Sequence, residues 1–352
     1  MMNRSASPAD AVVVGAGAGA GEGEAGFVVG KTAPRCSPAP DAAFRAALSR
    51  PLWLAPMAGV TDKAFRTICA RHGAGLAFTE MVSAAGLAHA GKKTWSLVDP
   101  APAEPAVVVQ LFGHDPQQMA SAAARVERRL GACLAAIDVN MGCPVRKVVR
   151  KGEGAALMNT PGLAAKIVAA LVEAVSVPVT VKIRAGWQEG EESAPELAQM
   201  LERAGAALVG VHGRTARQFY RGNADWGVIR RVKEAVGVPV AGSGDVFSAA
   251  DAEAMRAQTG CDVVYAARGA RGNPWIFEGR KPSDVERVEC ALEHLGLFCA
   301  FYGEEHLSPL RAQLSWYVHG LPGAAAMRRE LSAAVTRADF ERVFTQARMQ
   351  VS

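Results

Sequence analysis

The stretch VPVTVKIR, residues 177–184, begins as an apolar, β-branched run and ends with two cations, Lys182 and Arg184. Apolar residues on both faces of a strand are typical of a parallel sheet that helices cover on both sides. Seven similar runs begin near residues 52, 76, 106, 135, 207, 238 and 261, and successive runs start roughly 24 to 42 residues apart. This spacing leaves room for one helix after each strand, as in repeated βα units.

The segments between these runs are amphipathic and rich in Ala, Leu, Glu and Arg. DPQQMASAAARVERRL at 115–130 and TPGLAAKIVAALVEAV at 160–175 each carry an apolar stripe at helical spacing. Eight strands that are each followed by a helix can close into a barrel. The sequence therefore predicts an α/β protein built on a (β/α)8 TIM barrel.

The composition narrows the class of protein. The chain has 352 residues, of which 50% are hydrophobic, so it can bury a large core. Its seven cysteines show no CxxC spacing, which favours reduced thiols in a cytoplasmic protein over a disulfide framework or a metal site. No apolar run is long enough for a membrane span, and a net charge of +5 permits a polyanionic partner. We expect a cytoplasmic monomer without metal.

The N-terminal region contains a glycine-rich stretch, VVVGAGAGAG at 12–21, that is similar to a dinucleotide-binding turn. Such a turn must open a helix, yet glycine and proline recur through 21–40 and prevent one. We therefore expect a flexible low-complexity extension over 1–45, a barrel over 46–280 and a helical domain over 281–352.

Polar residues occur at or just past the end of most predicted strands. In barrels of this kind the reactive residues lie at the carboxyl ends of the strands, and phosphate sites favour the loops after strands seven and eight. The residues that fall there are Glu80, Gln110, Asn140, Cys143, Lys182, Arg184, His212, Arg214 and Asp245. They are the candidate site residues.

The last two strand-end loops, GSGD at 242–245 and ARGARGN at 267–273, supply glycines and Arg268, a combination suited to a phosphate monoester. Such a phosphate site together with Lys182 is compatible with a flavin mononucleotide enzyme. It is equally compatible with a phosphosugar aldolase in which Lys182 forms a Schiff base. Cys143 favours the flavin enzyme.

Seven ordered motifs carry a resemblance to a known family. They are APMAGVTDKAFR (55–66), VQLFGHDP (109–116), DVNMGCPVRKVVRKGEGAALM (138–158), VTVKIRAGW (179–187), HGRTARQFYRGNADW (212–226), GSGD (242–245) and RGNPWIF (271–277). Together they resemble the tRNA-dihydrouridine synthases, most of all the bacterial B-type branch, and SWYVHGLPGAAAMRREL at 315–331 is similar to that branch's helical C-terminal domain. The resemblance implies an FMN enzyme that uses NADPH to reduce the C5–C6 double bond of selected uridines in tRNA.

The same resemblance implies a role for individual residues. Asn140 and Arg184 would face the uracil, and the flavin would be held by Pro56, Met57, Ala58, Gln110, Lys182, His212, Ser243, Gly244, Asp245, Ala267 and Arg268. The family usually has Asn at the position of Ser243 and Gly at that of Ala267. Since Ser reaches less far and Ala adds a methyl group, we expect an altered phosphate contact rather than a lost cofactor.

Reduction of an electron-poor alkene needs a hydride at one carbon and a proton at the other. Hydride should pass from flavin N5 to uracil C6, and Cys143 is the expected proton donor at C5. A thiol with an ordinary pKa of about 8.5 is mostly protonated at neutral pH, so it can act as a general acid. The target base must also turn out of the tRNA fold to reach a barrel mouth.

The turn after Cys143 carries Arg146, Lys147, Arg150 and Lys151, which form either a solvated loop or a contact with RNA phosphates. Residues 280–352 contain nine Lys and Arg and nine Asp and Glu, so RNA binding there rests on the resemblance alone. Two alternatives remain. One is a flavin barrel acting on a free small molecule, and the other is a non-catalytic RNA-binding regulator.

Overall fold

The computed structural model describes residues 40–89 and 91–351, in which eight parallel strands form one sheet. The strands are β1 (Leu52–Leu54), β2 (Val82–Ser83), β3 (Val107–Phe112), β4 (Leu134–Asn140), β5 (Val179–Arg184), β6 (Leu208–His212), β7 (Val240–Ser243) and β8 (Val263–Ala266). Their order is β1-β8-β7-β6-β5-β4-β3-β2. Single parallel bridges, Leu54 with Ala77 and Phe78 with Val108, close the ring between β1 and β3. The predicted TIM barrel is confirmed.

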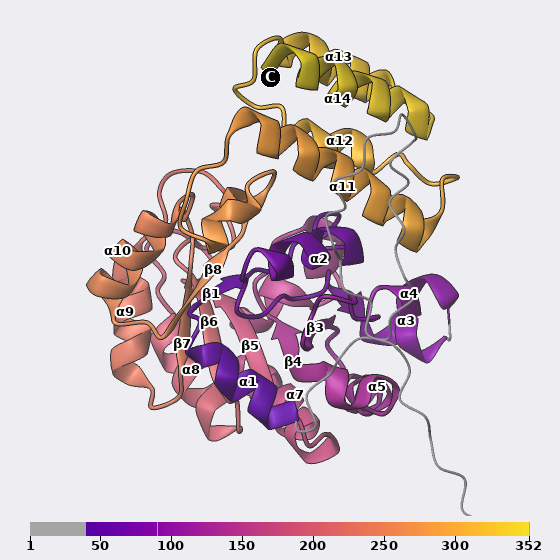
Figure 1. The fold of residues 1–352 in the computed structure, drawn as a ribbon. Helices are drawn as coiled ribbons and strands as arrows, with labels where there is room; N and C mark the ends of the chain where they lie inside the picture. The colour runs from indigo at the N-terminus through magenta and orange to yellow at the C-terminus, as the bar shows by residue number, and fades with distance from the viewer. Residues whose placement is uncertain (1–39, 90, 352) are drawn as a thin grey trace, which may run out of the picture.

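Helices follow the strands and surround the ring (Figure 1). They are α2 (Lys63–Arg71), α3 (Ala84–Ala88), α4 (Lys92–Ser96), α5 (Pro116–Leu130), α6 (Arg146–Val149), α7 (Pro161–Ala174), α8 (Ala194–Arg203), α9 (Trp226–Ala235) and α10 (Ala249–Thr259), with 3₁₀ turns at Gly131–Cys133, Gly154–Asn159, Arg268–Ala270 and Pro274–Phe277. Aspartate caps such as Asp62 and Asp115 begin α2 and α5 by accepting a backbone N–H three residues later.

Aromatic side chains fill the interior of the barrel below the carboxyl ends of its strands. The rings of Trp53, Phe78 and Tyr265 lie 5.1 to 6.5 Å apart between centroids. Gly210 faces them, because a Cβ there would lie 2.6 Å from the Tyr265 ring. This filled interior leaves only the carboxyl ends of the strands open for a site.

Helix α1 (Pro40–Leu48) corrects one predicted boundary. The sequence assigns 1–45 to a flexible extension, but the helix starts at Pro40 because Phe44 and Ala47 have apolar partners. Phe44 makes an edge contact with Trp53 at 5.8 Å, and the Trp53 indole donates to the carbonyl of Ala47 at 3.1 Å. The rest of the predicted extension, 1–39, lies outside the described residues, and so does the glycine-rich stretch at 12–21.

Four further helices form a separate layer at the top of Figure 1. They are α11 (Asp284–Tyr302), α12 (Leu310–Ser315), α13 (Ala324–Ala333) and α14 (Arg337–Val351). Their own apolar core also takes in Ala64 and Ile68 of α2 and Trp275 of the barrel. The helical layer is thus attached to the barrel through α2. Among the described residues, none of the helices is both long enough and apolar enough to span a bilayer.

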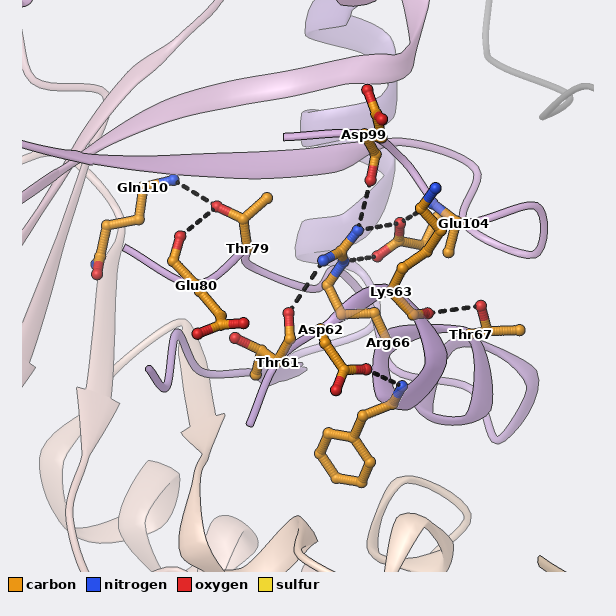
Figure 2. A network of polar contacts seen from close by, with 12 residues as sticks. Thr61, Asp62, Lys63, Arg66, Thr67, Thr79, Glu80, Asp99, Glu104 and Gln110 are labelled. Atoms are coloured by element: carbon orange, nitrogen blue, oxygen red, sulfur yellow. Dashed lines mark hydrogen bonds and ion pairs between the residues drawn. The ribbon is translucent and has the colours of Figure 1, made fainter. Parts of the chain in front are cut away.

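A buried ion pair joins helix α2 to the segment between α4 and β3 (Figure 2). The Arg66 guanidinium donates to Glu104 at 2.7 Å, to the Thr61 carbonyl at 3.0 Å and to the Asp99 carbonyl at 2.8 Å. Both side chains of the pair are almost fully buried. The adjacent Asp62 accepts from Gln313 of α12 at 2.7 Å, so the same region also holds the helical layer.

The cysteines depart from one expectation. Cys69, Cys143, Cys261, Cys290 and Cys299 are free thiols. Cys133 is half-buried and is disulfide-bonded. The prediction of reduced thiols is therefore wrong at Cys133.

The Glu104→Gln substitution tests the importance of the buried pair. We expect it to lower the free energy of unfolding by about 3 kcal/mol or more, because it leaves the Arg66 charge buried without a counter-charge. Urea denaturation followed by circular dichroism measures this loss. The control is Glu234→Gln, which removes an exposed partner of Arg230 and should change the value by about 0.5 kcal/mol at most. Equal effects of the two substitutions would contradict the account.

Candidate functional site

A pocket of about 320 Å³ opens at the carboxyl ends of the barrel strands. It brings together all the sequence-predicted site residues except Glu80, Arg214, Arg146 and Lys147, namely Pro56, Met57, Ala58, Gln110, Asn140, Cys143, Lys182, Arg184, His212, Ser243, Gly244, Asp245, Ala267 and Arg268. These residues come from β1, from β3 to β8 and from the loops that follow them. The barrel topology alone therefore gathers side chains that are more than 200 residues apart.

A chain of side-chain amides forms one wall of the pocket. The Asn140 side-chain amide donates to the side-chain oxygen of Gln110 at 2.8 Å, and the Gln110 side-chain amide donates to the Asp138 carboxylate at 2.7 Å. The Asn140 oxygen accepts the backbone N–H groups of Cys143 at 2.9 Å and Gly142 at 3.2 Å. Asn140 therefore fixes the start of the loop that carries Cys143.

Asp138 supports this wall and is not among the residues that the sequence predicts. It is fully buried and also accepts from the Thr180 hydroxyl at 2.6 Å. Burial raises the pKa of Asp138 to about 6, although the hydrogen bonds from Gln110 and Thr180 and the charge of Lys182 act in the opposite direction. A carboxylate within an otherwise apolar strand was the available signal.

Cys143 is half-buried at the pocket wall. Burial raises the pKa of its thiol, against the opposing effects of the Val145 N–H and the charges of Arg184 and Lys182. The thiol is therefore protonated at neutral pH. Gly154, at φ +61°, lies beneath the loop, where a Cβ would come within 2.8 Å of the Cys143 carbonyl. The site thus offers a positioned S–H group.

Lys182 extends into the same pocket from β5. Burial and the nearby Arg184 charge lower its pKa to about 8, while Asp138 acts to raise it. Among the described residues, its ammonium group has no hydrogen-bonded or ion-paired oxygen within reach. Lys182 is consequently available to a bound anion or carbonyl.

Arg184 has several partners within the protein. It donates to the carbonyls of Gly142 at 2.7 Å, Thr215 at 2.9 Å and Phe219 at 3.0 Å. Burial is the main cause that lowers its pKa to about 10. Arg184 therefore braces the loops after β4 and β6 against each other, in addition to lining the pocket.

The loops after β7 and β8 meet at Asp245. Its carboxylate accepts from Arg214 at 2.7 Å, from Arg268 at 3.0 Å and from the Ala224 N–H at 2.8 Å. Burial would raise the pKa of Asp245, but these donors together hold it below its ordinary value. Since a carboxylate repels a phosphate, Asp245 is suited to orienting Arg268 rather than to contacting an anion itself.

His212 lies beside this cluster and is buried. Desolvation, followed by the charges of Lys182, Arg184, Arg214 and Arg268, holds its pKa well below the ordinary value. Its imidazole is therefore neutral at physiological pH. It can exchange a hydrogen bond with a ligand, but it adds no positive charge.

The mouth of the pocket includes residues that were not singled out from the sequence. The Arg268 guanidinium lies 5.1 Å from the centre of the Tyr220 ring and 5.5 Å from that of Phe247. Arg271 also lines the pocket, and its buried Nε finds no partner within the described chain. The motifs HGRTARQFYRGNADW and RGNPWIF already contained Tyr220 and Arg271, but their spacing gave no reason to select them.

Four predicted residues do not line this pocket. Glu80 accepts the backbone N–H of Gly59 after β1, and Arg214 donates to Asp245 at 2.7 Å behind the pocket wall. The other two lie on α6. Arg146 lines a second hollow of about 440 Å³, and Lys147 is exposed on α6 and lines neither cavity. Across residues 40–89 and 91–351, no group of three or more His, Cys, Asp or Glu side chains is placed to hold a metal ion.

Solved structures with a similar fold are distant in sequence. The 2-naphthoyl-CoA reductase complex aligns with a TM-score of 0.51 and 14% identity over 65% of this chain and 49% of that one. The amine oxidase HisD from Pseudomonas geniculata N1 aligns with a TM-score of 0.51 and 13% identity over 71% and 53% of the two chains. This chain spans about half the length of each, and the likeness supports the fold alone.

Relatives in sequence are much closer. A probable tRNA-dihydrouridine synthase from Rickettsia bellii is 41% identical over 297 residues, which cover 80% of this chain and 89% of the relative. A tRNA-dihydrouridine synthase B from Xanthomonas axonopodis is 40% identical over 295 residues, with coverage of 80% and 88%. The family model described as dihydrouridine synthase matches residues 53–351. The resemblance seen in the sequence is confirmed, and the chain belongs to the dihydrouridine synthase family.

Proposed function

We propose that this protein reduces the C5–C6 double bond of specific uridines in tRNA to 5,6-dihydrouridine, with FMN as cofactor and NADPH as reductant. The observation that carries the proposal is that Cys143 and Lys182 line one pocket at the barrel mouth of a dihydrouridine synthase family member. A thiol that can donate a proton and a cation with no internal partner are the groups that such a reduction requires.

The charges of the pocket fit a bound phosphate monoester. Lys182, Arg184, Arg268 and Arg271 line it, and Asp245 is the single carboxylate among its lining residues. The Gly244 backbone, at φ +120°, approaches closely there, since a Cβ would lie 2.6 Å from Ala224 and 2.9 Å from the His212 ring. Arg268, Gly244 and His212 would hold the phosphate of FMN.

The remaining lining residues suit a flavin ring. Pro56, Met57 and Ala58 offer an apolar turn above the barrel, and Gln110 and Lys182 offer polar groups from β3 and β5. FMN would supply the hydride chemistry when bound. Ser243 and Ala267, which stand where the family usually has Asn and Gly, both line the pocket near Arg268. We propose that they modify the contact with the FMN phosphate and do not abolish it.

The protein's own contribution to the reaction is proton donation and alignment. Asn140 orients the Cys143 loop and Asp138 fixes Gln110, so the thiol is held in one place. Cys143 would donate its proton to C5 of the uracil as negative charge develops there, and Lys182 would stabilise that charge. Arg184 and Asn140 would border the uracil.

The tRNA would approach from the open end of the barrel. Arg146 and Lys147 lie on α6 directly after the Cys143 loop, and Arg328 and Arg329 are exposed on α13 of the helical layer. Contacts between these cations and phosphates would orient the tRNA and select the uridine. We propose that residues 281–352 act as the tRNA-binding domain and that the protein acts as a cytoplasmic monomer.

Replacing Arg268 by Ala tests the cofactor assignment. We expect FMN to bind about 10 to 100 times more weakly, because a charge-assisted contact with the phosphate is lost. Flavin absorbance after purification and titration of the apoprotein with FMN measure the effect. Arg203→Ala, an exposed position on α8, serves as the control. Unchanged affinity in Arg268→Ala would rule out this phosphate site.

Replacing Cys143 by Ala tests the proton donor. The variant should keep FMN, accept electrons from NADPH and bind tRNA like the parent, but form dihydrouridine about 10²- to 10⁴-fold more slowly, since only proton donation is lost. Stopped-flow oxidation of prereduced protein by dihydrouridine-free tRNA measures this step. Oxidation at the parental rate would remove Cys143 from the mechanism, and slowed reduction by NADPH would assign it to the other half-reaction.

A further inference from the structure

A second hollow of about 440 Å³ lies beside the pocket that contains Cys143. Its walls come from three loops at the barrel mouth, those after β4, β5 and β6. The lining residues are Pro144, Arg146, Val149, Arg150, Trp187, Ala216, Arg217 and Phe219. Pro144 and Phe219 line both cavities, so the hollow and the first pocket share a wall.

The walls of this hollow are held together by backbone hydrogen bonds. Ala216 donates to the Gly186 carbonyl at 2.9 Å, and Arg217 donates to the Trp187 carbonyl at 3.0 Å. Within the loop after β5, Gly186 allows the chain to fold back on itself, because a Cβ there would lie 1.9 Å from the Glu191 carbonyl. The backbone of Trp187 and of Arg217 is therefore positioned by the fold and does not depend on a ligand.

The hollow carries positive charge that the protein does not neutralise. Arg146, Arg150 and Arg217 are exposed, and within residues 40–89 and 91–351 none of them has a carboxylate within ion-pair distance. Many other arginines in the chain do have one, such as Arg231 with Glu192. Three unpaired guanidinium groups around a tryptophan are typical of surfaces that bind phosphodiesters and stacked bases.

Phe219 separates the two cavities in an unusual conformation. It is a non-glycine residue in the left-handed region, at φ 54°, and its side chain is 41% exposed. Its carbonyl is fixed by Arg184 at 3.0 Å. Strained backbone conformations are concentrated at functional sites, so the exposed ring of Phe219 is a candidate for contact with a ligand.

We infer that this hollow binds the nucleotide next to the target uridine in the RNA chain. The neighbouring base lies against Trp187, Phe219 separates it from the uridine in the first pocket, and Arg146, Arg150 and Arg217 contact the adjoining phosphates. The inference rests on the proposed function and adds a specificity-determining subsite to it. Base stacking on aromatic rings and arginine contacts to phosphates favour an unpaired strand over a duplex at this position.

The test compares two double variants of the flavin-bound full-length protein. Arg146→Gln with Arg217→Gln removes two charges from the hollow, and Arg203→Gln with Arg256→Gln removes two from the last turns of α8 and α10, at the opposite end of the barrel. Affinity for dihydrouridine-free tRNA is measured over a series of KCl concentrations. The hollow variant should bind roughly 10-fold more weakly, and its salt dependence should fall by about 1.4 in log–log slope, the value for two single-strand phosphate contacts.

A second measurement detects the stacked base. The tRNA carries 2-aminopurine next to the uridine that the parent modifies, and its fluorescence should be quenched by the parent and not by Trp187→Ala. Flavin reduction by NADPH should be the same in all variants.

Equal weakening in both double variants, or unchanged quenching in Trp187→Ala, would overturn the subsite. A raised KM for NADPH with unchanged tRNA affinity would assign the hollow to the reductant instead. Failure to form dihydrouridine in the parent would refute the proposed function separately, since tRNA affinity is measured independently of turnover.

Discussion

Filling a closed ring of eight parallel strands is the constraint on which the rest of this structure depends. The rings of Trp53, Phe78 and Tyr265 occupy the lower interior, and Gly210 gives Tyr265 the space it needs. The inward positions further along the strands are then left to polar residues such as Gln110 and Lys182. The site is polar because it begins where the aromatic core ends.

The polar layer is organised by two kinds of interaction. Hydrogen bonds among Asp138, Gln110 and Asn140 orient neutral groups and the Cys143 loop. Burial, reinforced by repulsion between neighbouring cations, lowers the pKa of Lys182 and of Arg184 and keeps His212 neutral. An anion bound in this site reduces the free-energy cost of holding several positive charges close together. The proposed cofactor and the proposed RNA substrate are both anions and would both have this effect.

The sequence predicts the barrel and most of the residues that line the pocket, because these residues lie at the ends of the apolar runs that form the strands. Gln110, Lys182 and His212 were identified by their place at the end of an apolar run, a signal that needs no three-dimensional information. Three findings do not lie at the end of an apolar run. Asp138 is buried inside a strand, Arg271 depends on the path of a loop, and the hollow beside Trp187 arises only when three loops meet. The helix at Pro40 was missed because its stability comes from contact of Phe44 with Trp53 rather than from its own short sequence.

The central claim is that this chain forms dihydrouridine in tRNA. The most direct measurement is base-resolved mapping of dihydrouridine in tRNA from a strain that lacks the gene, before and after incubation with the purified flavin-bound protein and NADPH. The account predicts that defined uridines lose the modification in that strain and regain it on incubation. An unchanged dihydrouridine pattern in the deletion strain, with no new dihydrouridine after incubation, would contradict it.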